Sequence, residues 1–135
     1  MARNTVADVM TRRVVYLPAE TTVDEAAQAM RDEGIGDVVV TRAATLAGLV
    51  TDRDIVVRVI ASGLSPKDTT LGDIATHEIV MVAESASLDD AVQAMRERSI
   101  RRLLVCDADR NVVGIVSLGD IAMAGTTAMA SGNAS

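Results

Sequence analysis

The sequence predicts an α+β protein, close to α/β in the alternation of its elements, built from two copies of one unit. Each unit is a small β-sheet with flanking helices. The chain repeats itself: Val6–Arg42 aligns with Leu71–Asp107, and Leu46–Ile55 aligns with Val112–Ile121 after one inserted residue. Within each copy, short β-branched or apolar runs alternate with stretches of helical periodicity. Apolar residues make up 49% of the chain, which is typical of a globular protein.

Each copy opens with a short helical turn and a β-rich stretch. The turns are expected at Val6–Met10 and Leu71–Ala75, where a threonine is followed three residues later by an aspartate. This spacing is a capping-box pattern. The β-rich stretches follow at Val14–Leu17 and Ile79–Val82.

The clearest helix of each copy comes next. Thr22–Glu25 and Ser87–Asp90 are capping-box starts, and Gly34 ends the first of the two helices. Apolar residues then recur at helical spacing, which predicts one buried face per helix. The residues on these faces are Val23, Ala26, Ala27 and Met30 in the first copy and Leu88, Ala91, Val92 and Met95 in the second.

Two strands and a final helix complete each copy. A polar turn joins the two strands, as in a hairpin. The first final helix is expected to be regular and to end before Gly63, whereas the second is short. The expected elements are Val38–Thr41, Leu46–Val50 and Asp52–Ala61 in the first copy and Leu103–Cys106, Val112–Val116 and Leu118–Ala124 in the second.

The repeat sets the expected domains at residues 5–63 and 70–124, joined by the connector Leu64–Thr69. One unit of about 60 residues buries too little apolar surface to be comfortably stable alone. The two are therefore expected to pack as one pseudo-twofold module. Residues 125–135 are small and polar, and we expect a disordered tail.

The most informative motif is the junction at which the last strand of each copy runs into its last helix. Gly48–Ile55 and Gly114–Ile121 each place a hydroxyl residue at this junction and an aspartate three residues later. In one interpretation this pair is a helix cap. In the other, free backbone N–H groups and the hydroxyl face a phosphate while the carboxylate accepts two sugar hydroxyls. The residues concerned are Thr51 and Asp54 in the first copy and Ser117 and Asp120 in the second.

Composition excludes several classes of function. The net charge of −6 and the absence of a Lys/Arg run argue against a nucleic-acid partner. No apolar run approaches the length of a membrane span, and the N-terminus lacks a signal-peptide pattern. Cys106 is the single cysteine, so no internal disulfide forms, and we expect a cytoplasmic protein.

No catalytic or metal-binding constellation is visible in the sequence. A nucleophile–base pair, a Gly-rich phosphate loop, zinc-ligand spacing and paired catalytic carboxylates are all missing. His77 is the single histidine and stands in a polar turn without a second ligand nearby. The sequence therefore predicts a non-catalytic binding module with no metal site.

The repeat resembles a tandem pair of cystathionine-β-synthase (CBS) domains, also called a Bateman module. The resemblance rests on the order of elements and on the twice-repeated Gly-h-h-Thr/Ser-x-x-Asp motif, and it covers roughly residues 5–124. It implies regulatory binding of AMP, ADP, ATP or S-adenosylmethionine in clefts between the two domains, with Mg²⁺ accompanying ATP. By resemblance, Asp54 and Asp120 take the ribose hydroxyls, and Thr51 and Ser117 contact phosphate.

The resemblance also implies a wall for the adenine base and a basic residue for the phosphate. Arg101 and Arg102 stand at the basic position in the second copy, whereas Gly36 and Asp37 stand there in the first. An alternative for the arginines is solvated ion pairing with the acidic residues of the preceding helix. If they bind phosphate, the Ser117/Asp120 junction takes phosphate better than the Thr51/Asp54 junction. The wall residues are Thr11, Val14 and Val15 in the first copy and Thr76, Ile79 and Val80 in the second.

Two functions of different classes remain open. The first is a sensor that binds an adenine nucleotide and acts in trans on a protein partner that the sequence does not identify. The second is a ligand-free structural or interaction protein with vestigial clefts, related by family resemblance to stress or hypoxia responses. A homodimer is expected in both cases.

Overall fold

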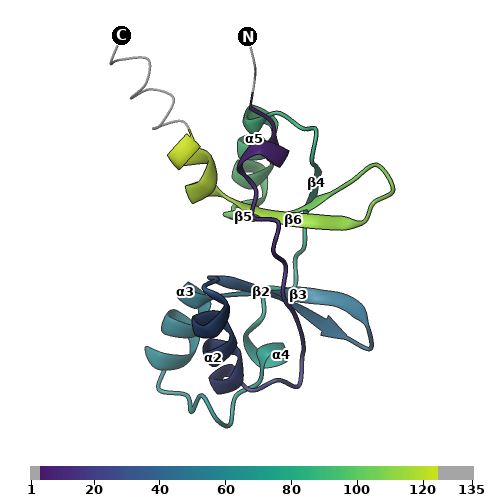
Figure 1. Cartoon of the computed structure of the whole chain (residues 1–135). Coiled ribbons are helices and arrows are strands. Elements are labelled where there is room, and N and C mark those ends of the chain that lie inside the picture. Colours follow the sequence, from purple (N-terminus) through teal and green to yellow (C-terminus); the bar gives the residue numbers. More distant parts are fainter. Residues whose placement is uncertain (1–3, 125–135) are drawn as a thin grey trace. The chain divides into compact units, whose positions relative to one another are not determined.

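Two sheets of the same topology organise the chain (Figure 1). A computed structural model describes residues 4–124, and its strands form two three-stranded sheets with the orders β1-β2-β3 and β4-β5-β6. In each sheet the first strand pairs parallel with the second, and the second pairs antiparallel with the third. The helices of each sheet lie on one of its faces. The predicted α+β class, with two small sheets and flanking helices, is confirmed.

The first sheet consists of β1 (Tyr16–Pro18), β2 (Asp37–Arg42) and β3 (Thr45–Thr51). The loop between β2 and β3 has two residues, Ala43 and Ala44, with φ of 52° and 63°. A two-residue hairpin loop with both φ angles positive matches the right-handed twist of the flanking strands. Neither residue is a glycine, so this tight turn carries local backbone strain.

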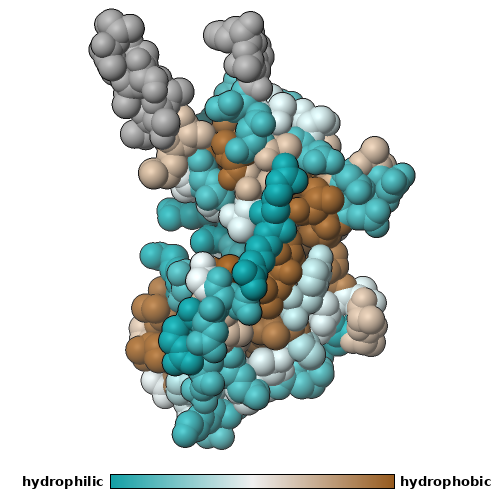
Figure 2. Space-filling model, in the orientation of Figure 1, coloured by the Kyte–Doolittle hydropathy of each residue, from teal (hydrophilic) through white to brown (hydrophobic). Residues whose placement is uncertain are grey.

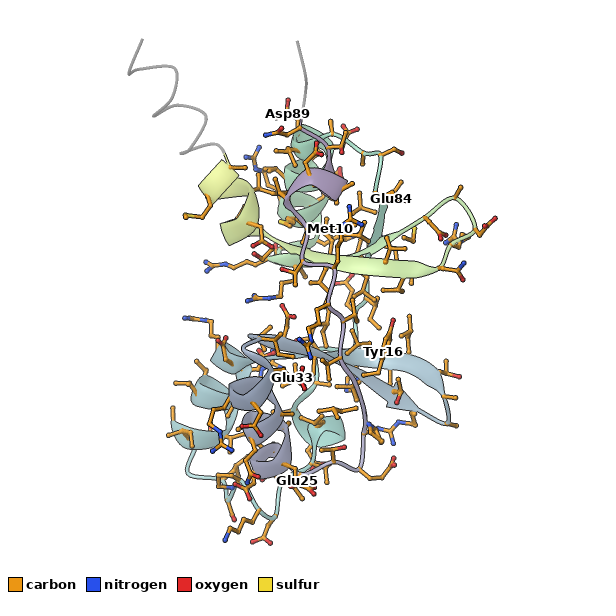
Figure 3. The ribbon with its side chains drawn as sticks, in the orientation of Figure 1. Met10, Tyr16, Glu25, Glu33, Glu84 and Asp89 are labelled. Atoms are coloured by element: carbon orange, nitrogen blue, oxygen red, sulfur yellow. The ribbon has the colours of Figure 1, made fainter. Side chains whose placement is uncertain are left out.

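Helix α2 (Val23–Glu33) connects β1 to β2 and begins at the predicted capping box. The Glu25 N–H donates to Thr22 Oγ1 at 3.2 Å, and the Thr22 N–H donates to Glu25 Oε1 at 3.2 Å. Glu25 lies in the first turn of the helix (Figure 3). Gly34, with φ of 68°, ends the helix in the left-handed conformation.

The helix after β3 differs from the regular helix expected over Asp52–Ala61. One α-helical turn, α3 (Asp52–Asp54), continues as a π-helix, η1 (Ile55–Ile60). The Ala61 N–H accordingly bonds to the Val56 carbonyl, five residues earlier. Five of the six residues of η1, all except Arg58, are β-branched. Such residues disfavour the regular α-helix, so the expectation is corrected here.

The second sheet repeats this arrangement. It consists of β4 (Met81–Ala83), β5 (Arg102–Cys106) and β6 (Val112–Ser117), with α5 (Leu88–Arg98) between β4 and β5. Residues 118–124 are helical and follow β6 directly. Every strand predicted from the sequence is therefore present, with bounds that differ from the predicted ones by at most two residues.

The two opening turns are exchanged between the repeats. By its packing the chain divides into a continuous unit, residues 15–79, and a split unit, residues 4–14 with residues 80–124. Helix α1 (Val6–Val9) belongs to the split unit, where the Val6 N–H donates to the Ala86 carbonyl at 2.9 Å. Helix α4 (Leu71–Ile74) belongs to the continuous unit, where the Leu71 N–H donates to the Thr21 carbonyl at 2.9 Å. The compact units thus differ from the sequence repeats, 5–63 and 70–124, in the turn that opens each one.

Each unit has its own apolar core, and the exchanged turn contributes to it. In the continuous unit Leu71 and Ile74 pack with residues of α2, β2, β3 and η1. In the split unit Val6 and Met10 pack with residues of α5, β5 and β6. The fully buried side chains of the two units include Val23, Val38, Val50, Val59 and Leu71 in the first and Val6, Leu103, Val105 and Val116 in the second.

In the part of the chain that the structure describes, no helix combines the length and the apolar character needed to span a membrane. The tail expected over residues 125–135 lies outside the described residues.

Candidate functional site

Both strand-to-helix junctions are capping boxes. In the continuous unit the Asp54 N–H donates to Thr51 Oγ1 at 3.1 Å, and the Thr51 N–H donates to Asp54 Oδ2 at 2.8 Å. In the split unit the Asp120 N–H donates to Ser117 Oγ at 3.0 Å, and the Ser117 N–H donates to Asp120 Oδ2 at 2.9 Å. The cap interpretation is therefore confirmed at both junctions. In each box the aspartate uses Oδ2, which leaves Oδ1 as a further acceptor.

The backbone N–H groups at the start of α3 already have partners. The Asp52 N–H donates to the Gly36 carbonyl at 2.9 Å, and the Arg53 N–H donates to Asp52 Oδ1 at 2.7 Å. Together with the cap, the first three N–H groups of this helix are occupied. The expectation of free backbone N–H groups facing a phosphate is wrong for this junction, because the carboxylate of Asp52 takes one of them.

The corresponding groups of the split unit differ at one position. The Leu118 N–H donates to the Arg101 carbonyl at 2.8 Å, as the Asp52 N–H does to Gly36. Leu118 has no carboxylate, so the next N–H, that of Gly119, lacks the side-chain acceptor that Arg53 has in Asp52. The helix start of the split unit therefore has one carboxylate fewer than that of the continuous unit, and it also lacks the arginine that follows this carboxylate.

The strands beside the junctions carry opposite charges. In the register of the first sheet Asp37 lies directly opposite Thr51, and in the second sheet Arg102 lies directly opposite Ser117. Both side chains are half-buried. Immediately before each strand, Gly36 of the first repeat aligns with Arg101 of the second. A Cβ at Gly36 would stand 3.1 Å from Asp52 Oδ2. The charge difference predicted from the sequence is thus located next to the two hydroxyls.

The wall residues combine across the repeats. Thr11 exchanges two backbone hydrogen bonds with Ile115, at 2.8 and 2.9 Å, on the strand that leads to Ser117. Thr76 does the same with Leu49, at 3.0 and 2.9 Å, on the strand that leads to Thr51. The split unit therefore holds Thr11, Val14 and Val80 with Ser117, Asp120, Arg101 and Arg102, and the continuous unit holds Val15, Thr76 and Ile79 with Thr51 and Asp54.

Glycines in the junction motif make this close approach possible. A Cβ at Gly48 would stand 2.7 Å from the Thr76 carbonyl oxygen and 3.0 Å from the Ala75 Cβ. A Cβ at Gly114 would stand 2.7 Å from the Met10 sulfur, which Figure 3 labels, and 2.8 Å from the Thr11 carbonyl oxygen. The sequence shows that both motifs begin with glycine, but only the structure shows that a segment of the other repeat passes there.

One basic residue near Asp54 was missed by the sequence analysis. The Arg58 Nε lies 3.8 Å from Asp54 Oδ1, and the Arg58 Nη1 donates to the Ile74 carbonyl at 2.7 Å. The spacing of four residues on a helix is a signal for an ion pair. The contact with Ile74 has no local signal, because Ile74 belongs to the exchanged turn.

A family model and similar proteins of known sequence match most of the chain. The family model "CBS domain" matches residues 6–61 and 71–126. The CBS domain-containing protein YhcV of Bacillus subtilis is 38% identical over 120 residues, which cover 89% of this chain and 84% of that protein. Hypoxic response protein 1 of Mycobacterium tuberculosis is 37% identical over 119 residues, covering 87% of this chain and 82% of that protein.

Two solved structures of similar proteins contain ligands. A CBS domain protein of Pyrobaculum aerophilum, PAE2072, complexed with AMP, has a TM-score of 0.71 at 26% identity and covers 87% of this chain and 89% of its own. A structure of Hypoxic Response Protein I, with two coordinated zinc ions, has a TM-score of 0.66 at 36% identity and covers 89% of this chain and 98% of its own. Over residues 4–124 of the present chain, His, Cys, Asp and Glu side chains form no group of three or more that could hold a metal ion.

Proposed function

Since the chain belongs to the CBS domain family, we propose that it is a non-catalytic regulatory module that binds adenosine-containing ligands. The ligands bind at the Thr51/Asp54 and Ser117/Asp120 junctions, and the module acts in trans on a protein partner in the cytoplasm. AMP, ADP, ATP and S-adenosylmethionine are the candidates, with Mg²⁺ accompanying ATP. The AMP complex of the P. aerophilum protein supports the ligand class.

The observation that carries this proposal is the aspartate that recurs at both junctions with Oδ1 outside its capping box. An ionised carboxylate is an acceptor only, and a ribose diol offers two donors. Hydrogen bonds to charged groups contribute about 1.5–3 kcal/mol each. A cap and a ribose contact are therefore compatible on one side chain.

The two junctions differ in their preference for phosphate under this proposal. Arg102 opposite Ser117 and the neighbouring Arg101 favour the phosphate of a nucleotide. Asp37 opposite Thr51 and Asp52 at the helix start disfavour it. We therefore expect the split unit to bind AMP more tightly than adenosine, and the continuous unit to discriminate little between them.

Titration calorimetry of the full chain with AMP and with adenosine tests the proposal. The variants are Asp120→Asn and Asp54→Asn, because asparagine retains a carbonyl oxygen for the cap but loses the charge. Asp120→Asn is expected to weaken AMP binding about tenfold or more, from the loss of a charged acceptor. Asp73→Asn is the matched control, since Asp73 caps helix α4 by accepting from the Thr70 N–H and lies in no junction.

Equal affinities in Asp120→Asn, Asp54→Asn and Asp73→Asn would contradict ligand binding at the junctions. That result, or the absence of heat with all the candidate ligands, would favour the second function, a ligand-free interaction protein. The occupied N–H groups at the start of α3 are the observation that favours this alternative.

We also propose a homodimer in either case. Branched apolar side chains gather on one exposed face of η1 and the loop after it, and Figure 2 shows apolar residues in the region of this helix. Buried Ile55 and Val59 occupy the opposite face of the same helix. An exposed apolar face of this kind is typical of a protein–protein contact. The apolar face consists of Val56, Val57, Ile60 and Leu64, which are 57%, 46%, 59% and 47% exposed.

A further inference from the structure

Arg58 joins two parts of the continuous unit that are far apart in the sequence. Its Nε faces Asp54 Oδ1 at 3.8 Å, four residues back along the helix. Its Nη1 donates at 2.7 Å to the carbonyl of Ile74, the last residue of α4. A carbonyl in the last turn of a helix has no partner within that helix, so Arg58 supplies a partner that the turn needs.

The two contacts of Arg58 link the carboxylate of Asp54 to the carbonyl of Ile74. Asp54 is the residue that the proposed function assigns to the ribose, and its side chain is 18% exposed, whereas that of Arg58 is 46% exposed. Ile74 is followed by Ala75 and by Thr76, whose backbone pairs with Leu49 beside the junction. The guanidinium therefore lies between the ribose acceptor and the segment that carries the wall residue Thr76.

The guanidinium group is suited to this double contact. Its N–H donors are held in one plane, so one group can face a carboxylate with Nε while Nη1 binds a carbonyl. A lysine has a single ammonium group on a flexible stem and reaches one of the two partners at a time.

The second repeat has no arginine at the position equivalent to Arg58. The residue four positions after Asp120 is Ala124, which has no charge and no donor in its side chain. The two junctions, alike in their capping boxes, therefore differ in how the aspartate is held.

We infer that Arg58 is a positioning residue of the Thr51/Asp54 junction, holding Asp54 Oδ1 and the Ile74–Thr76 segment in the arrangement that an adenosine ligand requires. This inference rests on the proposed function. It assigns to the continuous unit a preformed ribose site that does not depend on phosphate.

A double-mutant cycle on the full chain tests the inference. The probe is adenosine, because it lacks the phosphate, and the background is Asp120→Asn, which weakens the other junction. Arg58→Met is expected to raise the Kd for adenosine about fivefold, which is the size expected for a partly exposed ion pair. Arg58→Lys restores part of the affinity. Arg53→Met is the matched control, since Arg53 is an exposed arginine one residue from Asp54, and it leaves the Kd unchanged.

The cycle separates positioning from a general structural role. When Asp54→Asn is already present, Arg58→Met is expected to cause a smaller loss of affinity than with Asp54 intact, because only the contact with Ile74 remains to be lost. An equal loss in both backgrounds, or no loss with Asp54 intact, overturns the inference. If Asp54→Asn itself leaves adenosine binding unchanged, the proposed function of this junction fails and the inference with it. If Asp54→Asn weakens adenosine binding but Arg58→Met leaves the Kd for adenosine unchanged, the inference is refuted and the proposed function is not.

Discussion

At the scale of single residues, the junction motif combines three roles. Its hydroxyl and its aspartate cap a helix, and under the proposed function the aspartate also accepts from a ligand through its other oxygen. Its glycine has a different role, since Gly48 lets the Ala75–Thr76 segment approach the strand. The motif therefore marks a close contact between two backbone segments as well as a proposed binding site.

Gly48→Ala is expected to destabilise the chain by about 1–3 kcal/mol, the usual cost of inserting a methyl group into a well-packed site. The added Cβ meets the Thr76 backbone oxygen at 2.7 Å, and a backbone has little freedom to move aside. Urea unfolding followed by circular dichroism measures the change. Gly119→Ala is the control, because its Cβ would meet only Ser117 Oγ, at 3.6 Å. Equal stability of the two variants would contradict the close approach of the Thr76 backbone to Gly48.

At the scale of elements, the structure shows what local patterns determine. Thr22 and Glu25 predict the start of α2 correctly, because a capping box uses only neighbouring residues. The sequence did not predict the π-helical turn. The spacing of apolar residues distinguishes buried Ile55 and Val59 from the exposed face, but it does not determine whether the helix is an α-helix or a π-helix. Among the candidate site residues, the hydroxyl–aspartate pairs were predictable because their geometry is local.

The apolar face of η1 is expected to hold two copies of the chain together. The double variant Val57→Glu/Ile60→Glu places two charges in this face, and burial of unpaired charges is costly. Sedimentation velocity should show a dimer for the parent chain and a monomer for this variant. Ala27→Glu is the control and retains the dimer, because Ala27, which was expected on the buried face of α2, is exposed in the structure. A parent chain that sediments as a monomer would refute the proposed homodimer.

At the scale of the whole molecule, the exchanged turns are the feature that the sequence did not predict. The two opening turns carry the same capping pattern and similar apolar residues, so either turn suits either sheet locally. Which turn packs on which sheet depends on contacts between residues distant in the chain, such as Val6 with Ala86 and Leu71 with Thr21. The grouping of Thr11 with Ser117, and the contact of Arg58 with Ile74, follow from this choice and were inaccessible for the same reason.

The exchange predicts which fragments fold. A fragment of residues 15–79 contains the whole core of the continuous unit, whereas residues 5–63 lack Leu71 and Ile74, which are 0% and 5% exposed. Loss of each large buried side chain costs about 2–5 kcal/mol, a large part of the stability of a small domain. Thermal unfolding should therefore be cooperative and higher in midpoint for 15–79 than for 5–63. The reverse order, or equal midpoints, would contradict the exchange.

The division into a continuous and a split unit also sets an order of events during synthesis on the ribosome. All of residues 15–79 are translated before the second sheet begins at Met81, so the continuous unit is able to form before the split unit is complete. Helix α1 leaves the ribosome first, but β5 and β6 are made about 100 residues later, which takes on the order of ten seconds. During that interval Val6 and Met10 have no sheet to cover them. The nascent chain therefore carries an apolar N-terminal segment that is available to a chaperone until its C-terminal half is complete.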